Sequence, residues 1–305
     1  MESSISSRVI LSGASGMLGV AIQRALKAKS ISTLQLVRRK PAGAGELEWD
    51  PAAEPAIPDL APLEGAIAAI HLSGANVGAR RWTESYTREM IASRVASTQK
   101  LSTSLAGLQN RPKTLLVASA IGFYGNRGNE VLNESSQNGD GFLAGLCHAW
   151  EAAADPARQA GIRVVHMRFG VVLGSGGALR QMLPPFRIGL GARIGDGLQW
   201  MSWISLKDAV LAVLFALEDK RISGPVNVTS PNPVTNAEFT RALGRELGRP
   251  AFLSVPAFAV RLMFGKMADE ALLSSTRALP RKLMDAGFRF SEPNLNQALA
   301  SALRT

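Results

Sequence analysis

The chain has 305 residues, of which 46% are hydrophobic, and it carries a formal net charge of +10. This length and apolar content suffice for one large domain, or for a domain with a small second lobe, and they exclude general disorder. A basic chain can bind nucleic acid or an anionic membrane, but the cations are scattered and the longest basic run is 38–40, so we expect neither partner.

The first predicted element is a short buried strand at 9–11, followed at once by a glycine-rich turn and a helix from Val20 onward. The turn has the spacing G-x-x-G-x-x-G, with glycines at positions 13, 16 and 19. In a dinucleotide-binding unit, Gly13 makes the tight turn, Gly16 lets the backbone approach a pyrophosphate, and Gly19 lets the helix pack closely on the strand. Because the start of the helix offers free N–H groups to phosphate, the pattern predicts a dinucleotide site.

The second predicted strand, at 33–37, ends at two arginines, Arg38 and Arg39. In a dinucleotide-binding fold this position faces the adenosine ribose, where an acidic residue binds the 2′-hydroxyl of NAD and an arginine binds a 2′-phosphate. No Asp or Glu stands beside the arginines in the sequence, so the position predicts NADP. The alternative is a solvated basic turn.

Buried strands at 66–72, 113–118 and 163–168 alternate with predicted helices at 85–105 and 142–160. This alternation predicts an α/β fold with a Rossmann-type, doubly wound parallel sheet covered on both faces. His71 lies within an apolar strand, and we interpret it as a packed core residue. Ser119 follows a strand at the carboxyl edge, where open α/β sheets place their ligands.

The pattern changes after about residue 174. A short helix at 178–182 is expected to break at Pro184 and Pro185. A helix at 207–217 and a strand at 225–229 are expected to belong to the first domain, although they come later in the chain. The later helices are expected at 235–247, 256–264, 267–274 and 294–303. We therefore expect an NADP-binding domain at 1–175, with returns from about 203–230, and a smaller, mainly helical substrate-side lobe at 176–305.

Several segments together resemble the extended short-chain dehydrogenase/reductase superfamily, and more closely its atypical epimerase-like family with an added C-terminal helical domain, in the NAD-dependent epimerase/dehydratase superfamily. The segments are GASGMLG, HLSGANV, RRW with a later SR at 93–94, ASAIGFYG, WEAAA, RFGVVLG, GGALRQMLPPFRIGLG, WISLKDA and PRKLMDAGFRF. The resemblance covers nearly the whole chain. It implies an NADP(H)-binding fold with a substrate cleft between two lobes, and it implies no particular substrate.

The resemblance also implies which residues contact the cofactor. They lie in the glycine turn, after the second and third strands, on the following helix and near residue 172: Gly13, Ala14, Ser15, Gly16, Met17, Leu18, Gly19, Arg38, Arg39, Leu72, Ser73, Gly74, Glu89, Arg94 and Val172.

The catalytic positions depart from the wider superfamily, which uses a serine and then Tyr-x-x-x-Lys on a later helix. Ser119 matches the serine, but the aligned helix positions carry Cys147 and Glu151, and no Tyr-x-x-x-Lys occurs in the chain. The catalytic candidates are therefore Ser119, Tyr124, Cys147 and Glu151. Residues four apart share a helix face, so Cys147 and Glu151 should point together. The alternative for Glu151 is that it only packs or pairs with a nearby arginine.

The substrate side is expected to include Asn76, Arg193, Trp200 and Trp203, of which the last three lie in or beside a glycine-rich loop. For the two tryptophans, a place in the core of the lobe is the alternative. Metal catalysis is not expected, because the histidines at 71, 148 and 166 show no ligand spacing.

Three functions remain open on the sequence alone. The first is an NADP(H)-binding epimerase or oxidoreductase with an altered catalytic set, acting on an unknown small carbonyl or sugar-type substrate. The second is a non-catalytic NADP(H)-binding sensor or regulator, and the third and least supported is a basic structural or nucleic-acid-associated protein. The single cysteine and an N-terminus without signal-peptide features predict a cytoplasmic protein, expected as a monomer or homodimer.

Overall fold

The computed structural model describes residues 7–304. Residues 1–6, which carry most of the N-terminal stretch used for the cytoplasmic prediction, lie outside the described residues, as does residue 305. None of the described helices combines the length and the apolar character needed to cross a bilayer.

The centre of the fold is a seven-stranded parallel sheet in the order β12-β7-β5-β4-β1-β2-β3. Its strands are β1 (Arg8–Ser12), β2 (Ser32–Val37), β3 (Glu46–Glu48), β4 (Ala68–His71), β5 (Thr114–Ala120), β7 (Arg163–Phe169) and β12 (Gly224–Val228). The chain builds outward from β1 in both directions, so the carboxyl ends of β1 and β4 are the point where the strand order reverses and where open α/β sheets bind their ligands. This topology confirms the predicted Rossmann-type sheet.

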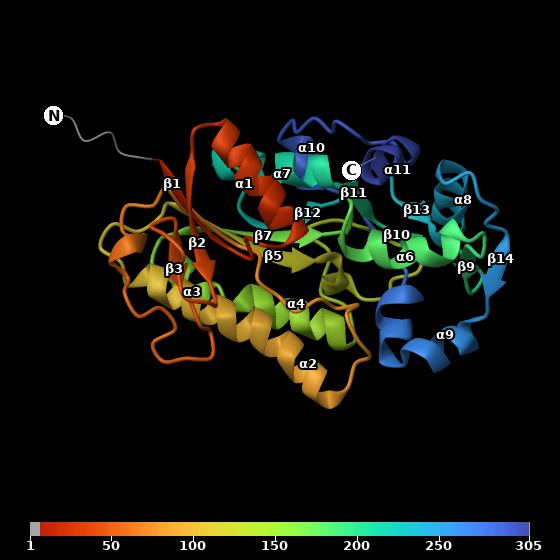
Figure 1. Ribbon diagram of the computed structural model, residues 1–305, viewed down its shortest axis with the longest axis horizontal. Helices are drawn as coiled ribbons and strands as arrows, with labels where there is room; N and C mark the ends of the chain where they lie inside the picture. The colour runs from red at the N-terminus through yellow and green to blue at the C-terminus, as the bar shows by residue number, and fades with distance from the viewer. Residues whose placement is uncertain (1–6, 305) are drawn as a thin grey trace.

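Helices cover both faces of the sheet (Figure 1). On one face, α1 (Met17–Ala28), α7 (Leu206–Glu218) and α10 (Arg281–Asp285) bury Ile22, Val213 and Leu283 in one core. On the other face, α3 (Ser97–Ala106), α4 (Phe142–Ala152) and α5 (Asp155–Gln159) bury Leu101, Trp150 and Ala157 in a second core. Helix α10 was not predicted from the sequence.

Two predicted helices are subdivided. The helix expected at 85–105 consists of α2 (Glu84–Ile91), a π-helical turn (Ala92–Ala96) and α3, which follow one another without a break. Such turns are frequent at functional sites, and this one carries Arg94. The helix expected at 142–160 is divided into α4 and α5.

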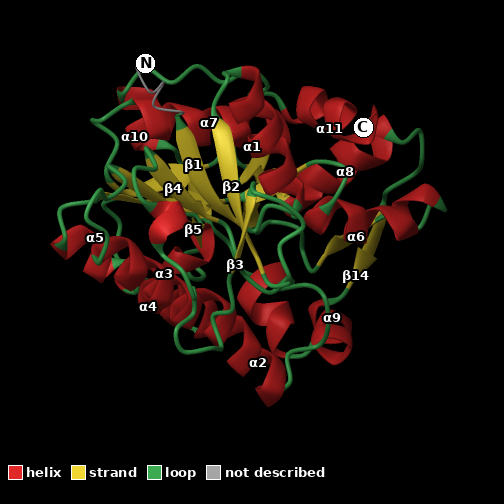
Figure 2. Ribbon diagram, turned by 60° about the vertical axis from the view of Figure 1, so that its left-hand side comes forward, coloured by secondary structure: helices red, strands yellow, loops and turns green. Residues whose placement is uncertain are grey.

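The C-terminal lobe packs α6 (Gly177–Arg187), α8 (Asn236–Glu246) and α11 (Leu295–Arg304) around a third core, to one side of the sheet (Figure 2). Its other helical segments are α9 (Ala257–Phe264) and a π-helical turn, η4 (Ala268–Leu272). Four two-stranded pairs connect the remaining segments: β8 (Val171–Leu173) with β11 (Trp203–Ser205), β9 (Ala192–Ile194) with β14 (Leu253–Val255), β10 (Trp200–Met201) with β13 (Val234–Thr235), and β6 (Val131–Leu132) with β15 (Arg277–Ala278).

The prediction that a helix breaks at the two prolines was wrong, because α6 continues through Pro184 and Pro185 to Arg187. Each proline removes one helical N–H, but both lie on the exposed face, where water can bind the freed carbonyl groups. On the opposite face, Leu183 and Phe186 are buried in the core of the lobe and hold the helix in place.

The lobe is also fastened to the sheet domain through the carboxylate of Glu270 in η4. This carboxylate accepts hydrogen bonds from the backbone N–H groups of Phe142 (2.9 Å) and Leu143 (3.0 Å), at the start of α4. Because the first N–H groups of a helix have no partner within it, the second lobe supplies the N-terminal cap of α4.

His71 is fully buried beside the glycine turn, as predicted for a core residue. Its Nδ1 lies 2.6 Å from Ser12 Oγ, and its Nε2 lies 3.1 Å from Ser97 Oγ. The Ser97 hydroxyl donates to the carbonyl of Ser93, so it accepts from Nε2, and the neutral ring with its proton on Nε2 satisfies both contacts. Burial lowers the pKa of His71 from 6.5 to about 4.

We expect the free energy of unfolding to fall as the pH drops from about 6.5 to about 4. In this range the imidazole of His71 binds a proton in the unfolded chain but stays neutral in the folded protein, where it is buried. Replacing His71 with Gln should remove about 2–3 kcal/mol of the difference in stability between pH 7 and pH 4.5. Urea unfolding of both proteins at the two pH values measures this difference. An identical pH dependence in parent and variant would contradict the assignment.

Candidate functional site

The glycine turn between β1 and α1 is packed so closely that two of its glycines are required by the chain itself. Gly13 has a positive φ of 70°, and a Cβ there would lie 2.8 Å from the carbonyl carbon of Leu72. A Cβ on Gly19 would lie 2.3 Å from the Gly13 carbonyl oxygen, so α1 packs against the turn backbone. These are the tight-turn and close-packing roles that the spacing predicts.

Gly16 differs from its two neighbours, because the fold does not need a glycine at this position. Its φ of −72° suits any residue, and a Cβ would approach only the Gly13 oxygen, at 3.4 Å. Gly16 is exposed, and no side chain caps the start of α1. The turn therefore keeps an open cradle of backbone N–H groups, which fits the pyrophosphate of a dinucleotide. Ser15, Met17 and Leu18 border this cradle, whereas Ala14 is buried.

The turn after β2 contains a carboxylate that the sequence reading missed. Glu46 on β3 binds the Arg39 guanidinium through both oxygens, at 2.5 Å to Nη2 and 2.7 Å to Nη1. It also accepts from the N–H of Ala42 at 2.7 Å. Arg38 is exposed and pairs with no described carboxylate. No acidic residue is adjacent to the arginines in the sequence, but the fold brings Glu46 against Arg39, so the inference that this turn lacks a carboxylate was wrong.

The loop after β4 is held by Arg94 from the π-helical turn. Nη2 of Arg94 donates to the Ala75 carbonyl at 2.8 Å, and a Cβ on Gly74 would lie 3.2 Å from the guanidinium carbon. Arg94 is 8% exposed, and no described carboxylate pairs with it. Arg94 thus holds the backbone path past Ser73 and places a positive charge beside the loop that follows β4.

Three further candidates for cofactor or substrate contacts, Glu89, Asn76 and Val172, make contacts of their own. Glu89 is exposed on α2 and forms a surface ion pair with Arg80. The exposed Asn76 closes its own turn, since its side-chain oxygen accepts from the N–H of Gly78 at 2.9 Å. Val172 lies on β8 and pairs with Ile204 of β11.

Ser119, at the carboxyl end of β5, is hydrogen-bonded to Glu151 on α4. Its hydroxyl donates to Oε1 at 2.8 Å. Arg168, near the end of β7, binds both oxygens of the same carboxylate, with Nε at 2.7 Å from Oε1 and Nη2 at 2.8 Å from Oε2. The side chain of Arg168 is 4% exposed and that of Glu151 is 12% exposed, so the ion pair is buried. The arginine pairing considered for Glu151 is thus present, but inside the site rather than on the surface.

Tyr124 joins the same network but is completely buried. Its hydroxyl donates to Asn227 Oδ1 at 2.7 Å and accepts from Arg168 Nη1 at 3.1 Å. Burial raises the pKa of this phenol, and the opposing effect of Arg168 is smaller. Because the hydroxyl is already bonded on both sides inside the protein, the structure does not place Tyr124 where it could donate a proton to a substrate.

Cys147 lies one helical turn before Glu151, within an apolar cluster that includes Phe123 and Leu132. Burial, together with the nearby negative charge of Glu151, raises the pKa of its thiol to about 12. The thiol is protonated near neutral pH, so Cys147 is neither a base nor an activated nucleophile there. Its burial also leaves the residue 3% exposed, so the structure offers no support for Cys147 as a catalytic base.

The two tryptophans of the second lobe have different environments. Trp203 is fully buried in the core of the lobe, and its Nε1 donates to the Asn232 carbonyl at 2.9 Å, so its prediction as a substrate contact was wrong. Trp200 is half-buried, and its Nε1 donates to Asn129 Oδ1 at 3.0 Å. The guanidinium of Arg277 stacks 4.1 Å above its ring.

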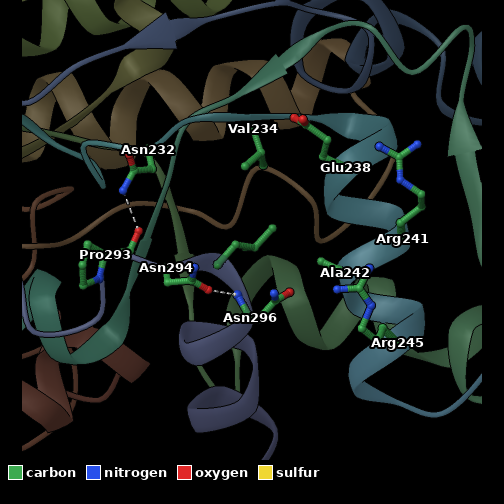
Figure 3. Close-up of a pocket in the computed structure, with 10 residues that line it drawn as sticks. Asn232, Val234, Glu238, Arg241, Ala242, Arg245, Pro293, Asn294 and Asn296 are labelled. Atoms are coloured by element: carbon green, nitrogen blue, oxygen red, sulfur yellow. Dashed lines mark hydrogen bonds between the residues drawn. The ribbon is translucent and has the colours of Figure 1, made fainter.

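A hollow of about 340 Å³ lies beside the Trp200 contact, and Asn129, Gln199, Arg261 and Ser275 are among its lining residues. The exposed Arg193 belongs to β9, in the same part of the lobe. A second hollow, of about 330 Å³, lies between α8 and α11, and Figure 3 shows Arg241 and Arg245 projecting from one of its walls. Neither lining contains a candidate residue, but Asn129 in the lining of the hollow beside Trp200 accepts a hydrogen bond from that candidate. The hollow beside Trp200 is therefore the better substrate-side candidate.

Arg168 and Glu46 are the two site residues that the sequence reading did not select. One sequence signal could have identified Arg168, since a charged residue near the end of a buried strand needs a partner. Glu46 had none, because its contact with Arg39 depends on how β3 is placed next to β2. Within the described residues, no group of three or more His, Cys, Asp or Glu side chains forms a metal site.

Residues 9–229 match the model of the NAD dependent epimerase/dehydratase family, and residues 255–302 match a domain of unknown function, DUF1731. An epimerase family protein of Mycobacterium bovis is 46% identical over 295 residues, which cover 96% of this chain and 97% of that protein.

Two solved structures are similar over nearly the whole chain. The crystal structure of human epimerase family protein SDR39U1 with NADPH has a TM-score of 0.87 and 34% identity, covering 98% of this chain and 99% of that one. A nucleoside-diphosphate sugar epimerase from Corynebacterium glutamicum has a TM-score of 0.79 and 34% identity. The match covers 97% of this chain and 58% of that longer chain.

The different environments of the two tryptophans predict different effects of truncation. Trp203→Ala should destabilise the protein by about 3–5 kcal/mol, because it empties a packed core. Trp200→Ala should cost about 1 kcal/mol, because the side chain is half-exposed. Chemical unfolding measures both. Equal losses would show that Trp200 also belongs to the core.

Proposed function

Because the chain belongs to the NAD-dependent epimerase/dehydratase family, we propose that it binds NADP(H) and acts as an epimerase or oxidoreductase on a small carbonyl or sugar-type substrate. The observation that carries this proposal is the hydrogen bond between Ser119 and Glu151 at the carboxyl edge of the sheet. It brings a hydroxyl and a carboxylate together on the sheet edge that also carries the glycine turn.

Three features support NADP(H) as the cofactor. The Gly16 cradle has room for a pyrophosphate, and the exposed Arg38 can bind a 2′-phosphate. The human relative was crystallised with NADPH. A sugar-type substrate is supported by the related nucleoside-diphosphate sugar epimerase. When bound, the nicotinamide cofactor supplies the redox chemistry.

The direction of the hydrogen bond between Ser119 and Glu151 determines whether the Ser119 hydroxyl can donate to a substrate or accept from it. Its only hydroxyl hydrogen points to Glu151, so its oxygen is left to accept from a substrate hydroxyl. In the proposed step the substrate O–H bond breaks, its proton passes to Ser119 Oγ, and the Ser119 proton passes to Glu151 Oε1. Arg168 holds the carboxylate in line for this transfer. The set therefore suits proton removal from an alcohol, and it replaces the missing Tyr-x-x-x-Lys.

Binding without turnover is the second candidate, and a specific observation favours it. Tyr124 is completely buried, and Glu151 already forms an ion pair with Arg168. A sensor would need the cofactor cradle but no free acid or base. The two candidates differ in turnover, not in cofactor affinity.

The cofactor cradle can be tested with two glycine substitutions. Gly16→Val should fold and lose most NADPH affinity, because the added side chain fills the space for the pyrophosphate. Gly19→Val should destabilise the protein, because its Cβ would collide with the Gly13 oxygen at 2.3 Å. Thermal melting and NADPH fluorescence titration measure the two effects. Normal NADPH binding by Gly16→Val would contradict the proposed cofactor site.

Turnover can be tested with NADP⁺ and a panel of UDP-sugars and small secondary alcohols, followed by NADPH absorbance. If Glu151 is the proton acceptor, Glu151→Gln should lower kcat by about 10²- to 10⁴-fold while leaving NADPH affinity unchanged. Because the change leaves buried Arg168 without its carboxylate partner, thermal melting is measured for the variant to show that it is folded. Asp155→Asn is the matched control, because Asp155 pairs with Arg158 on the surface. NADPH binding by the parent without turnover of any panel member would favour the sensor.

A further inference from the structure

The carboxylate of Glu46 lies at the place where a dinucleotide fold distinguishes NADP from NAD. Strand β3 runs parallel to β2, with Gln35 opposite Glu46 and Val37 opposite Glu48. Glu46 therefore lies two residues before the end of the pairing, and the turn after Val37 reaches it through the Arg39 side chain and the N–H of Ala42. The Glu46 side chain is only 15% exposed, and its three hydrogen bonds fix it in that position.

Two opposite effects meet at this turn. Arginine and lysine at 38–40 attract a 2′-phosphate, whereas a carboxylate at the ribose end favours the 2′-hydroxyl of NAD and repels phosphate. Glu46 occupies two of the three guanidinium nitrogens of Arg39 and balances its charge. Arg38 remains as an exposed cation without a described carboxylate partner.

We propose that Glu46 is a specificity-determining residue that reduces the preference of this protein for NADP(H) over NAD(H). The inference rests on the proposed cofactor function. Arg38 supplies the attraction for the 2′-phosphate. Glu46 weakens the contribution of Arg39 and adds a negative charge close to the bound phosphate. The unmodified ribose of NAD(H) carries no charge there, so Glu46 acts on one cofactor far more than on the other.

The effect on affinity is measured by titrating the full chain with NADPH and with NADH at low ionic strength. Glu46→Gln keeps an oxygen that can accept from Ala42 but removes the charge. It should tighten NADPH binding about two- to fivefold and leave NADH binding unchanged. The gain should shrink in high salt, because exposed charges are screened.

Two further variants complete the test. Arg38→Ala should weaken NADPH binding, with the opposite sign to Glu46→Gln. Glu218→Gln is the matched control, because Glu218 pairs with Lys29 after the far end of α1, and it should change neither affinity. Thermal melting shows whether each variant is folded.

The outcomes separate the inference from the proposed function. Weaker NADPH binding by Glu46→Gln would mean that the carboxylate orients Arg39 for the phosphate, and it would overturn the inference. An unchanged ratio of the two affinities would overturn it as well, while NADPH binding by the parent would leave the proposed function standing. A parent protein that binds neither cofactor would overturn both.

Discussion

The buried ion pair between Arg168 and Glu151 is the contact on which the geometry of the candidate site depends. It connects the end of β7 to α4, and its hydrogen bonds extend to Ser119 on β5 and to Tyr124, which in turn reaches Asn227 on β12. A buried charge without a partner destabilises a protein by several kcal/mol, so the loss of either side chain alone would weaken the fold. The pair therefore fixes the rotation of α4 with Glu151 facing the strand ends.

This pair also reverses the charge arrangement of the superfamily that the chain resembles. There a lysine on the helix places a positive charge beside a tyrosine. Here the helix carries the negative charge of Glu151, and the positive charge comes from Arg168 on a strand. Tyr124 still accepts a hydrogen bond from that cation, but burial dominates and its pKa rises. The site thus keeps a cation, but the helix position that carries the lysine in that superfamily carries a carboxylate here.

Local patterns predicted most of the fold, because the parallel strands are apolar runs and Gly19 packs against the turn just before it. Features that depend on distant packing were not predictable in this way. The helix through Pro184 is held by the core of the lobe, and the burial of Trp203 depends on α8 and α11. Glu46 meets Arg39 only because β3 joins the sheet. Composition and spacing carry no information on such contacts.

The cap that Glu270 provides for α4 has a consequence for where this protein can be divided. The segment that matches the epimerase model ends at residue 229, yet Glu270, the β15 strand and buried Leu283 all come from the later part of the chain. Without them, α4 would lose its N-terminal cap, β6 its partner strand and the sheet part of one covering layer. We therefore expect that residues 9–229 would not fold alone as they do in the whole chain, because the later segment completes their helix cap, strand pair and covering layer.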